Sequence, residues 1–131
     1  MKTFMNSLSN TKTYGPYSHT VTVENFFFTS GQIFVEYDEK LKKFPNLYDQ
    51  TFNTLKKIKT LLIHENFKIS DIIKTTIFTT QLNNLEIINT AYKKFFKKYT
   101  TIYPARSCVG VSQLPYDALV EIEVIAHTKR K

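Results

Sequence analysis

Four side chains near the C-terminus, an arginine, a thiol and two carboxylates, stand in apolar strands, and the charged ones are out of place there if packing is their only role. Arg106 and Cys108 lie two positions apart in one apolar run, and Glu121 and Glu123 lie two positions apart in the next. Successive side chains of a strand alternate between its faces, so each pair shares a face. Charged side chains are costly to bury unless they are paired or face a ligand. These two runs, joined by a proline-containing turn, are therefore the candidate site.

Spacing alone leaves two interpretations of the role of Arg106 open. Its planar guanidinium can hold a carboxylate through two parallel hydrogen bonds, which a lysine cannot imitate. It can equally form a structural ion pair with Glu121 or Glu123. A glutamate of this pair that lines a cleft is a candidate base for activating water.

Cys108 is the only cysteine of the chain and therefore a candidate nucleophile. No histidine lies near it in sequence to activate it, although Arg106 on the same face would lower the pKa of the thiol. We favour a small, half-buried residue that lines the site. The three histidines show no metal-ligand spacing, so we expect no metal. The three glycines form neither a phosphate loop nor a dinucleotide fingerprint, so we expect no nucleotide cofactor.

Length and composition favour one globular domain over residues 1–131. A single cysteine cannot form an internal disulfide, which favours a reducing compartment. The sequence shows no signal peptide and no stretch near the roughly 20 apolar residues of a membrane span, so we expect a soluble cytoplasmic protein. The net charge of +7 would suit nucleic acid, but the lysines fall on the polar sides of predicted helices, so we interpret them as solvated surface.

The elements that must position the site alternate between strands and helices. Residues 1–13 are predicted to be a loose arm or a short edge strand, and residues 18–23 and 26–31 are predicted strands, the second strongly buried. Apolar residues at helical spacing predict helices over 46–66 and 85–99, the first capped by Asn46 with Asp49 and ended by Asn66. Residues 72–80 and the two site runs complete the strands.

This order predicts an α+β fold, with a single mixed sheet and two helices packed on one face. The last strand is predicted to have two different faces. One face carries Val120, Ile122, Val124 and Ala126, and the other carries Glu121, Glu123 and Ile125. A second sheet face that mixes apolar and charged residues fits a subunit interface holding a polar site. We therefore expect a homo-oligomer.

Five blocks of the chain resemble the RidA (YjgF) family, in the family's order and spacing, from about residue 14 to the C-terminus. They are Gly15-Pro16-Tyr17-Ser18, Thr29-Ser30-Gly31-Gln32-Ile33, Lys74-Thr75-Thr76-Ile77-Phe78, Pro104-Ala105-Arg106-Ser107-Cys108-Val109, and Glu121-Ile122-Glu123 with Ile125-Ala126. The resemblance implies a chorismate-mutase-like fold and a homotrimer with sites between subunits. It also implies hydrolysis of 2-iminobutanoate and 2-iminopropanoate to 2-oxo acids and ammonia, without a metal or organic cofactor. An alternative is a role in RNA binding, translation inhibition or chaperoning, as described for some relatives.

The resemblance also assigns roles by position. Arg106 would hold the substrate carboxylate, and Glu121 would orient or activate the attacking water. The residues that would line the pocket are Tyr17, Ser30, Gly31, Asn89 and Cys108. Departures from the family pattern at His19, Phe34, Lys57 and Asn66 leave substrate preference and loop shape open; we interpret His19 as a surface residue.

Overall fold

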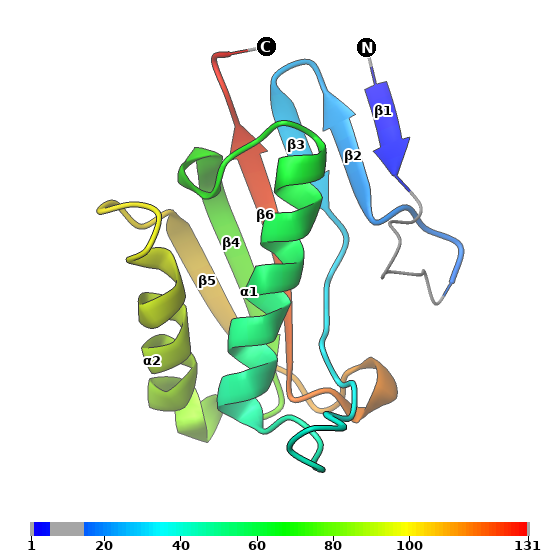
Figure 1. Ribbon diagram of the computed structural model, residues 1–131, viewed down its shortest axis with the longest axis vertical. Helices are drawn as coiled ribbons and strands as arrows, with labels where there is room; N and C mark the ends of the chain where they lie inside the picture. The colour runs from blue at the N-terminus through cyan, green and yellow to red at the C-terminus, as the bar shows by residue number, and fades with distance from the viewer. Residues whose placement is uncertain (1, 6–14, 131) are drawn as a thin grey trace.

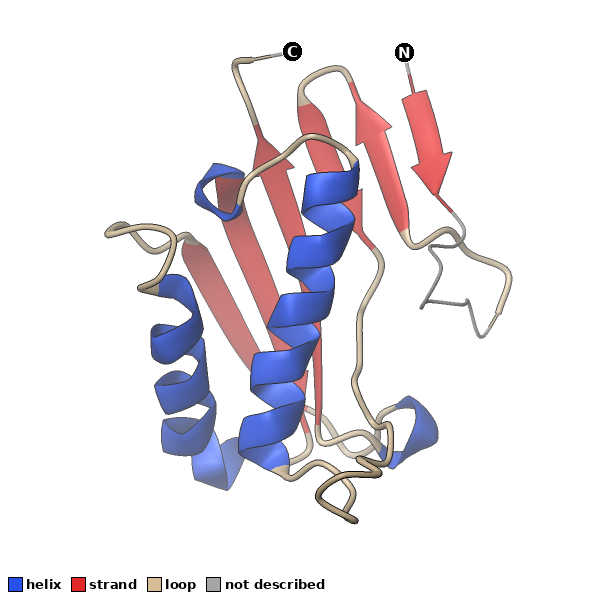
Figure 2. Ribbon diagram, viewed as in Figure 1, coloured by secondary structure: helices blue, strands red, loops and turns tan. Residues whose placement is uncertain are grey.

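The computed structural model describes residues 2–5 and 15–130, and these form a sheet with both long helices on one of its faces (Figures 1 and 2). The sheet has six strands in the order β1-β2-β3-β6-β4-β5. Their bounds are β1 (Lys2–Met5), β2 (Thr20–Val23), β3 (Phe26–Thr29), β4 (Ile72–Thr79), β5 (Ala105–Gly110) and β6 (Val120–His127). β4 and β5 run parallel and the other neighbours antiparallel, so the sheet is mixed, as predicted.

The parallel pair follows from its connection, because α2 (Leu85–Phe96) crosses over between β4 and β5. The other helix, α1 (Leu47–His64), begins with the predicted capping box. Asn46 Oδ1 accepts from the Asp49 backbone N–H at 2.9 Å, and the Asp49 carboxylate accepts from the Asn46 N–H at 3.4 Å. Just beyond the helix Asn66 has φ 65°, the left-handed conformation expected of it.

The core lies between the helices and the sheet. Both helices bury one stripe, and the central strands supply the opposing side chains. Its fully buried members include Leu55, Ile58 and Leu62 of α1, Ile88 and Phe96 of α2, and Ile77 and Ile122 of the sheet. No helix among the described residues is long and apolar enough to span a bilayer.

The prediction that β3 is strongly buried is wrong in part. Only Phe27 reaches the core, whereas Phe26 and Phe28 are 41% and 38% exposed. They alternate with Phe27 and therefore project from the face that the helices leave uncovered. The expected edge strand at the N-terminus is present as β1, while residues 6–13 of that prediction lie outside the described residues.

Candidate active site

Glu121 projects from the sheet face opposite the core and lines a cavity of about 200 Å³, which Lys57 of α1 also lines. It alternates with the buried Val120 and Ile122, which point into the core. Tyr17 and Gly31 line the same cavity, so three of the predicted site residues come together here. A Cβ atom built on Gly31 would lie 2.3 Å from Glu121 Oε2 and 2.6 Å from its Cδ. Only glycine therefore allows the carboxylate this position.

The segment that carries Gly31 is held by backbone bonds. Gln32 and Ile122 exchange two N–H···O bonds of 2.8 and 3.0 Å, and the Ser30 N–H donates to His19 O at 3.0 Å. Ser30 Oγ donates to Ser18 O at 2.7 Å. The hydroxyl of Ser30 thus joins the 18–19 segment to the glycine segment and stands behind the cavity rather than in its lining.

The carboxyl of Glu121 is harder to ionise than an ordinary glutamate. Burial raises its pKa, and the negative charge of Glu123 on the same face raises it further. A carboxyl with a raised pKa is better matched to proton transfer near neutral pH than an exposed one. The two glutamates share a face, as predicted, and the charge of Glu123 contributes to the raised pKa of Glu121.

Arg106 lies in a second cavity of about 300 Å³, beside the predicted site residue Asn89. The guanidinium carbon of Arg106 lies 5.0 Å from the ring centroid of Tyr92 on α2. Lys93 also lines this cavity, and no carboxylate does. The cavity therefore presents positive charge beside aromatic walls, which suits a substrate that combines a carboxylate with a short apolar part.

Cys108 follows Arg106 on the same face and packs against the core at partial burial. Burial raises the pKa of its thiol, and Arg106 opposes this only in part. A thiol held protonated is a poor nucleophile, which agrees with the expectation that Cys108 is not the catalytic nucleophile. Its side chain does not line either cavity in the described chain.

The two cavities share no residue, and the side chains of Arg106 and Glu121 project from opposite faces of the sheet. Arg106 pairs in register with Thr75, whose side chain contacts Tyr92 on the helix side, whereas Glu121 pairs with Phe78 on the other side. The structural ion pair of Arg106 with Glu121 or Glu123 is therefore wrong: among the described residues Arg106 forms none. Within one chain the two predicted catalytic residues therefore line separate cavities, which we call the Glu121 half-site and the Arg106 half-site.

The departures from the family pattern lie close to the Glu121 half-site. His19 is 2% exposed and lines its cavity, so its interpretation as a surface residue is wrong. Lys57 Nζ donates to Ile33 O at 3.2 Å, tying α1 to the glycine segment. Burial lowers the pKa of Lys57, and Glu36 partly offsets this. Phe34 lies beyond this cavity, in the groove along α1.

Sequence reasoning missed Tyr92 and Tyr103, which wall the Arg106 half-site. Tyr92 is one of the apolar residues whose spacing predicts the helix over 85–99, and that spacing alone indicates a core position. The spacing of Asn89 and Tyr92 was the available signal, because residues three apart on a helix are neighbours on its surface.

Known proteins match this chain over most of its length. The family model described as endoribonuclease L-PSP, the RidA (YjgF) family, matches residues 7–128. The chain belongs to this family. A RutC family protein of Buchnera aphidicola is 45% identical over 119 residues, covering 90% of this chain and 91% of the relative. The 2-iminobutanoate/2-iminopropanoate deaminase of Escherichia coli is 39% identical over 113 residues, covering 86% and 87%.

Solved structures of the family share the fold. The crystal structure of E. coli TdcF with bound serine has a TM-score of 0.80 at 38% identity, covering 89% of this chain and 91% of that one. The E. coli YjgF gene product has a TM-score of 0.84 at 33% identity, covering 97% and 100%. The predicted RidA-like α+β fold is thus confirmed, and relatives named as deaminases support deaminase chemistry in the family.

Proposed function

We propose that this protein hydrolyses 2-imino acids, among them 2-iminobutanoate and 2-iminopropanoate, to 2-oxo acids and ammonia in the cytoplasm. The observation that carries the proposal is the pair of half-sites. One has an arginine with aromatic walls and no carboxylate, and the other has a glutamate whose pKa is raised. To hydrolyse a 2-imino acid, an enzyme needs one group that binds the substrate carboxylate and a second group that transfers protons at the C=N bond.

The reaction divides between the two half-sites. Arg106 binds the substrate carboxylate through two hydrogen bonds and fixes the C=N carbon in place. Glu121 accepts a proton from water as the oxygen bonds to that carbon, and the proton returns to the nitrogen. The hydroxyl of the resulting carbinolamine then passes its proton, by way of Glu121, to the amine nitrogen. The C=O double bond forms as the C–N bond breaks, which releases ammonia and the 2-oxo acid. An imine reacts readily with water, so positioning and one proton carrier supply the catalysis.

The working enzyme is proposed to be a homotrimer in which each site lies between two subunits. Arg106 of one chain cannot meet Glu121 of the same chain across the sheet, but it can meet Glu121 of a neighbour in a head-to-tail ring. The uncovered sheet face, with the half-exposed Phe26 and Phe28, is the surface that such association would bury.

Activity is tested by adding the purified protein to a dehydratase that generates 2-iminobutanoate and measuring the release of 2-oxobutanoate and ammonia. We expect acceleration by this protein and at least a hundredfold loss, about the value of a misplaced substrate, in Arg106→Ala. No acceleration, or acceleration that survives Arg106→Ala, contradicts the proposal.

The shared site is tested by mixing two inactive variants. Arg106→Ala and Glu121→Gln chains, refolded together, should regain activity, because about a quarter of randomly formed boundaries combine an intact Arg106 with an intact Glu121 in a cyclic trimer. If each chain held a complete site, the mixture would stay inactive. Each variant refolded alone is the control.

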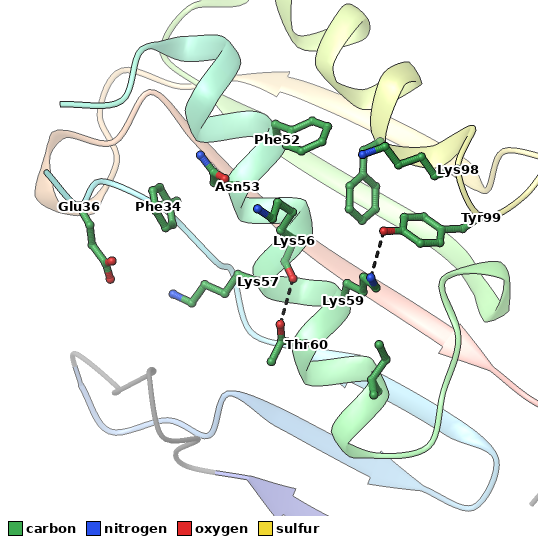
Figure 3. A pocket seen from close by; sticks show the side chains of 12 residues that line it. Phe34, Glu36, Phe52, Asn53, Lys56, Lys57, Lys59, Thr60, Lys98 and Tyr99 are labelled. Atoms are coloured by element: carbon green, nitrogen blue, oxygen red, sulfur yellow. Dashed lines mark hydrogen bonds between the residues drawn. The ribbon is translucent and has the colours of Figure 1, made fainter. Parts of the chain in front are cut away.

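A second candidate function is the binding of single-stranded RNA, favoured by a lysine groove on the helix layer (Figure 3). We define the lysine groove as the cavity of about 550 Å³ beside α1 that Lys56, Lys57, Lys59 and Lys98 line. Glu36 is its one lining carboxylate, and Phe52 and Tyr99 supply aromatic rings. Cations beside rings are the elements of single-strand binding.

This candidate is tested by the fluorescence anisotropy of a labelled oligouridine. Binding that weakens steeply with salt, and that Lys56→Gln with Lys98→Gln abolishes, would support it. Lys40→Gln with Lys129→Gln is the matched control for net charge outside the groove. Equal losses in both double variants would reduce the effect to net charge alone.

A further inference from the structure

Arg106 is held by a ring rather than by an acid. Its guanidinium carbon lies 5.0 Å from the centroid of the Tyr92 ring, and among the described residues it makes no ion pair. Arg106 is half-buried and lies on β5, an edge strand of the sheet. The aromatic contact is thus the interaction that the structure gives this guanidinium.

The Tyr92 ring is itself fixed. It is 4% exposed, and its hydroxyl forms a 2.9 Å hydrogen bond with the hydroxyl of Thr75, which is fully buried on β4. The ring lies 4.5 Å from the ring of Phe96 and stacks at 6.2 Å on that of Tyr103, both measured between centroids. Burial raises the pKa of Tyr92, so the phenol stays neutral and available for the bond to Thr75.

We propose that Tyr92 is a positioning residue for Arg106, the residue that binds the substrate carboxylate and that we call the clamp. A carboxylate partner would orient Arg106 but would also occupy the hydrogen-bond donors and cancel the charge that the substrate needs. A ring face attracts the guanidinium through its quadrupole and leaves the donors at the edge of the plane available. Tyr92 thereby orients Arg106 without competing with the substrate. This inference rests on the proposed function, since it gives Arg106 the role of clamp.

The fold explains how the contact arises. Thr75 and Arg106 are register partners on the parallel strands β4 and β5, so their side chains project together towards α2. Asn89 lies three residues before Tyr92 on the same helix and lines the same cavity. One face of α2 therefore supplies both the Tyr92 ring that contacts Arg106 and the polar side chain of Asn89 in the same cavity.

The first test separates the ring from the hydroxyl. Tyr92→Leu removes the ring and should raise KM about tenfold with a smaller fall in kcat, because the clamp loses orientation more than chemistry. Tyr92→Phe keeps the ring and should restore KM to within about twofold of the original protein, although it leaves the buried Thr75 hydroxyl without its partner. Thr75→Val is the matched control, since it removes the same hydrogen bond from the other side. Equal KM values in Tyr92→Leu and Tyr92→Phe would overturn the proposal.

The second test does not depend on catalysis. The order parameter of the Arg106 Nε–Hε group, measured by ¹⁵N relaxation, should fall in Tyr92→Leu and stay unchanged in Tyr92→Phe. An unchanged order parameter in Tyr92→Leu would overturn the positioning role even in an active enzyme. If the protein proves inactive but the order parameter falls, the contact holds and the proposed function fails. In Arg106→Lys, the further change Tyr92→Leu should alter KM by less than in the original protein, because the lysine lacks the planar group that the ring orients.

Discussion

At the scale of the residue, the close approach of Gly31 and Glu121 is the tightest constraint on the site. The carboxylate occupies space that any side chain at position 31 would claim. Burial and, in addition, the negative charge of Glu123 raise the pKa of the Glu121 carboxyl. The position of this carboxylate and the charge that acts on its pKa therefore depend on two different residues, Gly31 and Glu123, which can be changed separately.

Gly31→Ala should lower kcat by about a hundredfold, because the added Cβ forces Glu121 from its position. Gly110→Ala is the control, since its Cβ meets only the side chain of Leu82, which is 45% exposed and able to move. Steady-state kinetics on both variants, with circular dichroism to check folding, measure the effect. Full activity in Gly31→Ala would contradict the close packing.

Glu123→Gln should lower the pKa of Glu121, because it removes the negative charge that opposes ionisation. The carboxyl carbon of Glu121, followed by NMR against pH, reports this directly. The raised pKa means that the Glu121 carboxyl favours the folded state below its unfolded pKa and loses this contribution as pH rises through the folded pKa. The free energy of unfolding of Glu121→Gln should therefore depend less on pH across that window. An unmoved Glu121 titration in Glu123→Gln would show that burial acts alone.

At the scale of the element, α1 connects the core to the Glu121 half-site. Its Gln50 accepts from the Leu119 N–H at 2.9 Å, just before β6, and its Lys57 donates to Ile33. The helix start is fixed by its capping box. Losses at the cap should therefore affect stability while leaving the chemistry intact.

Asn46→Ala should lower the free energy of unfolding by about 1 kcal/mol, because it removes the side-chain acceptor of the Asp49 N–H. Asn46→Ser retains an acceptor and should recover most of this loss. Chemical denaturation of both variants gives the difference, and kcat/KM should be unchanged in each. A fall in kcat/KM would mean that the cap also shapes the site.

At the scale of the whole molecule, the two faces of the sheet have different roles. One is covered by α1 and α2 (Figure 2). The other carries the half-exposed Phe26 and Phe28 as well as Glu121. A monomer seldom leaves such a face open to water, and the proposed homotrimer would bury it.

Phe28→Asp should convert the proposed trimer to monomers, because it places an unpaired charge in the middle of the buried face. Light scattering after size-exclusion chromatography measures the mass, and deaminase activity should fall with it. Leu41→Asp is the control, as it changes a residue of the 38–45 loop that is 63% exposed. A Phe28→Asp variant that keeps the mass of the unchanged protein would contradict burial of this face.

The sequence by itself determined the elements and the chemistry that they carry. Strand alternation placed Glu121 with Glu123, helical spacing located both helices, and the cap and stop residues marked the ends of α1, because these signals depend on neighbours along the chain. The interpretation of His19 as a surface residue was wrong and the predicted burial of β3 was wrong in part, because burial depends on which strands and loops pack alongside. Only the tertiary structure decided that Arg106 and Glu121 lie on opposite faces, since relative face depends on strand order and register rather than spacing. It also decided that Arg106 rests on Tyr92, a contact between a strand and a helix that no local pattern encodes.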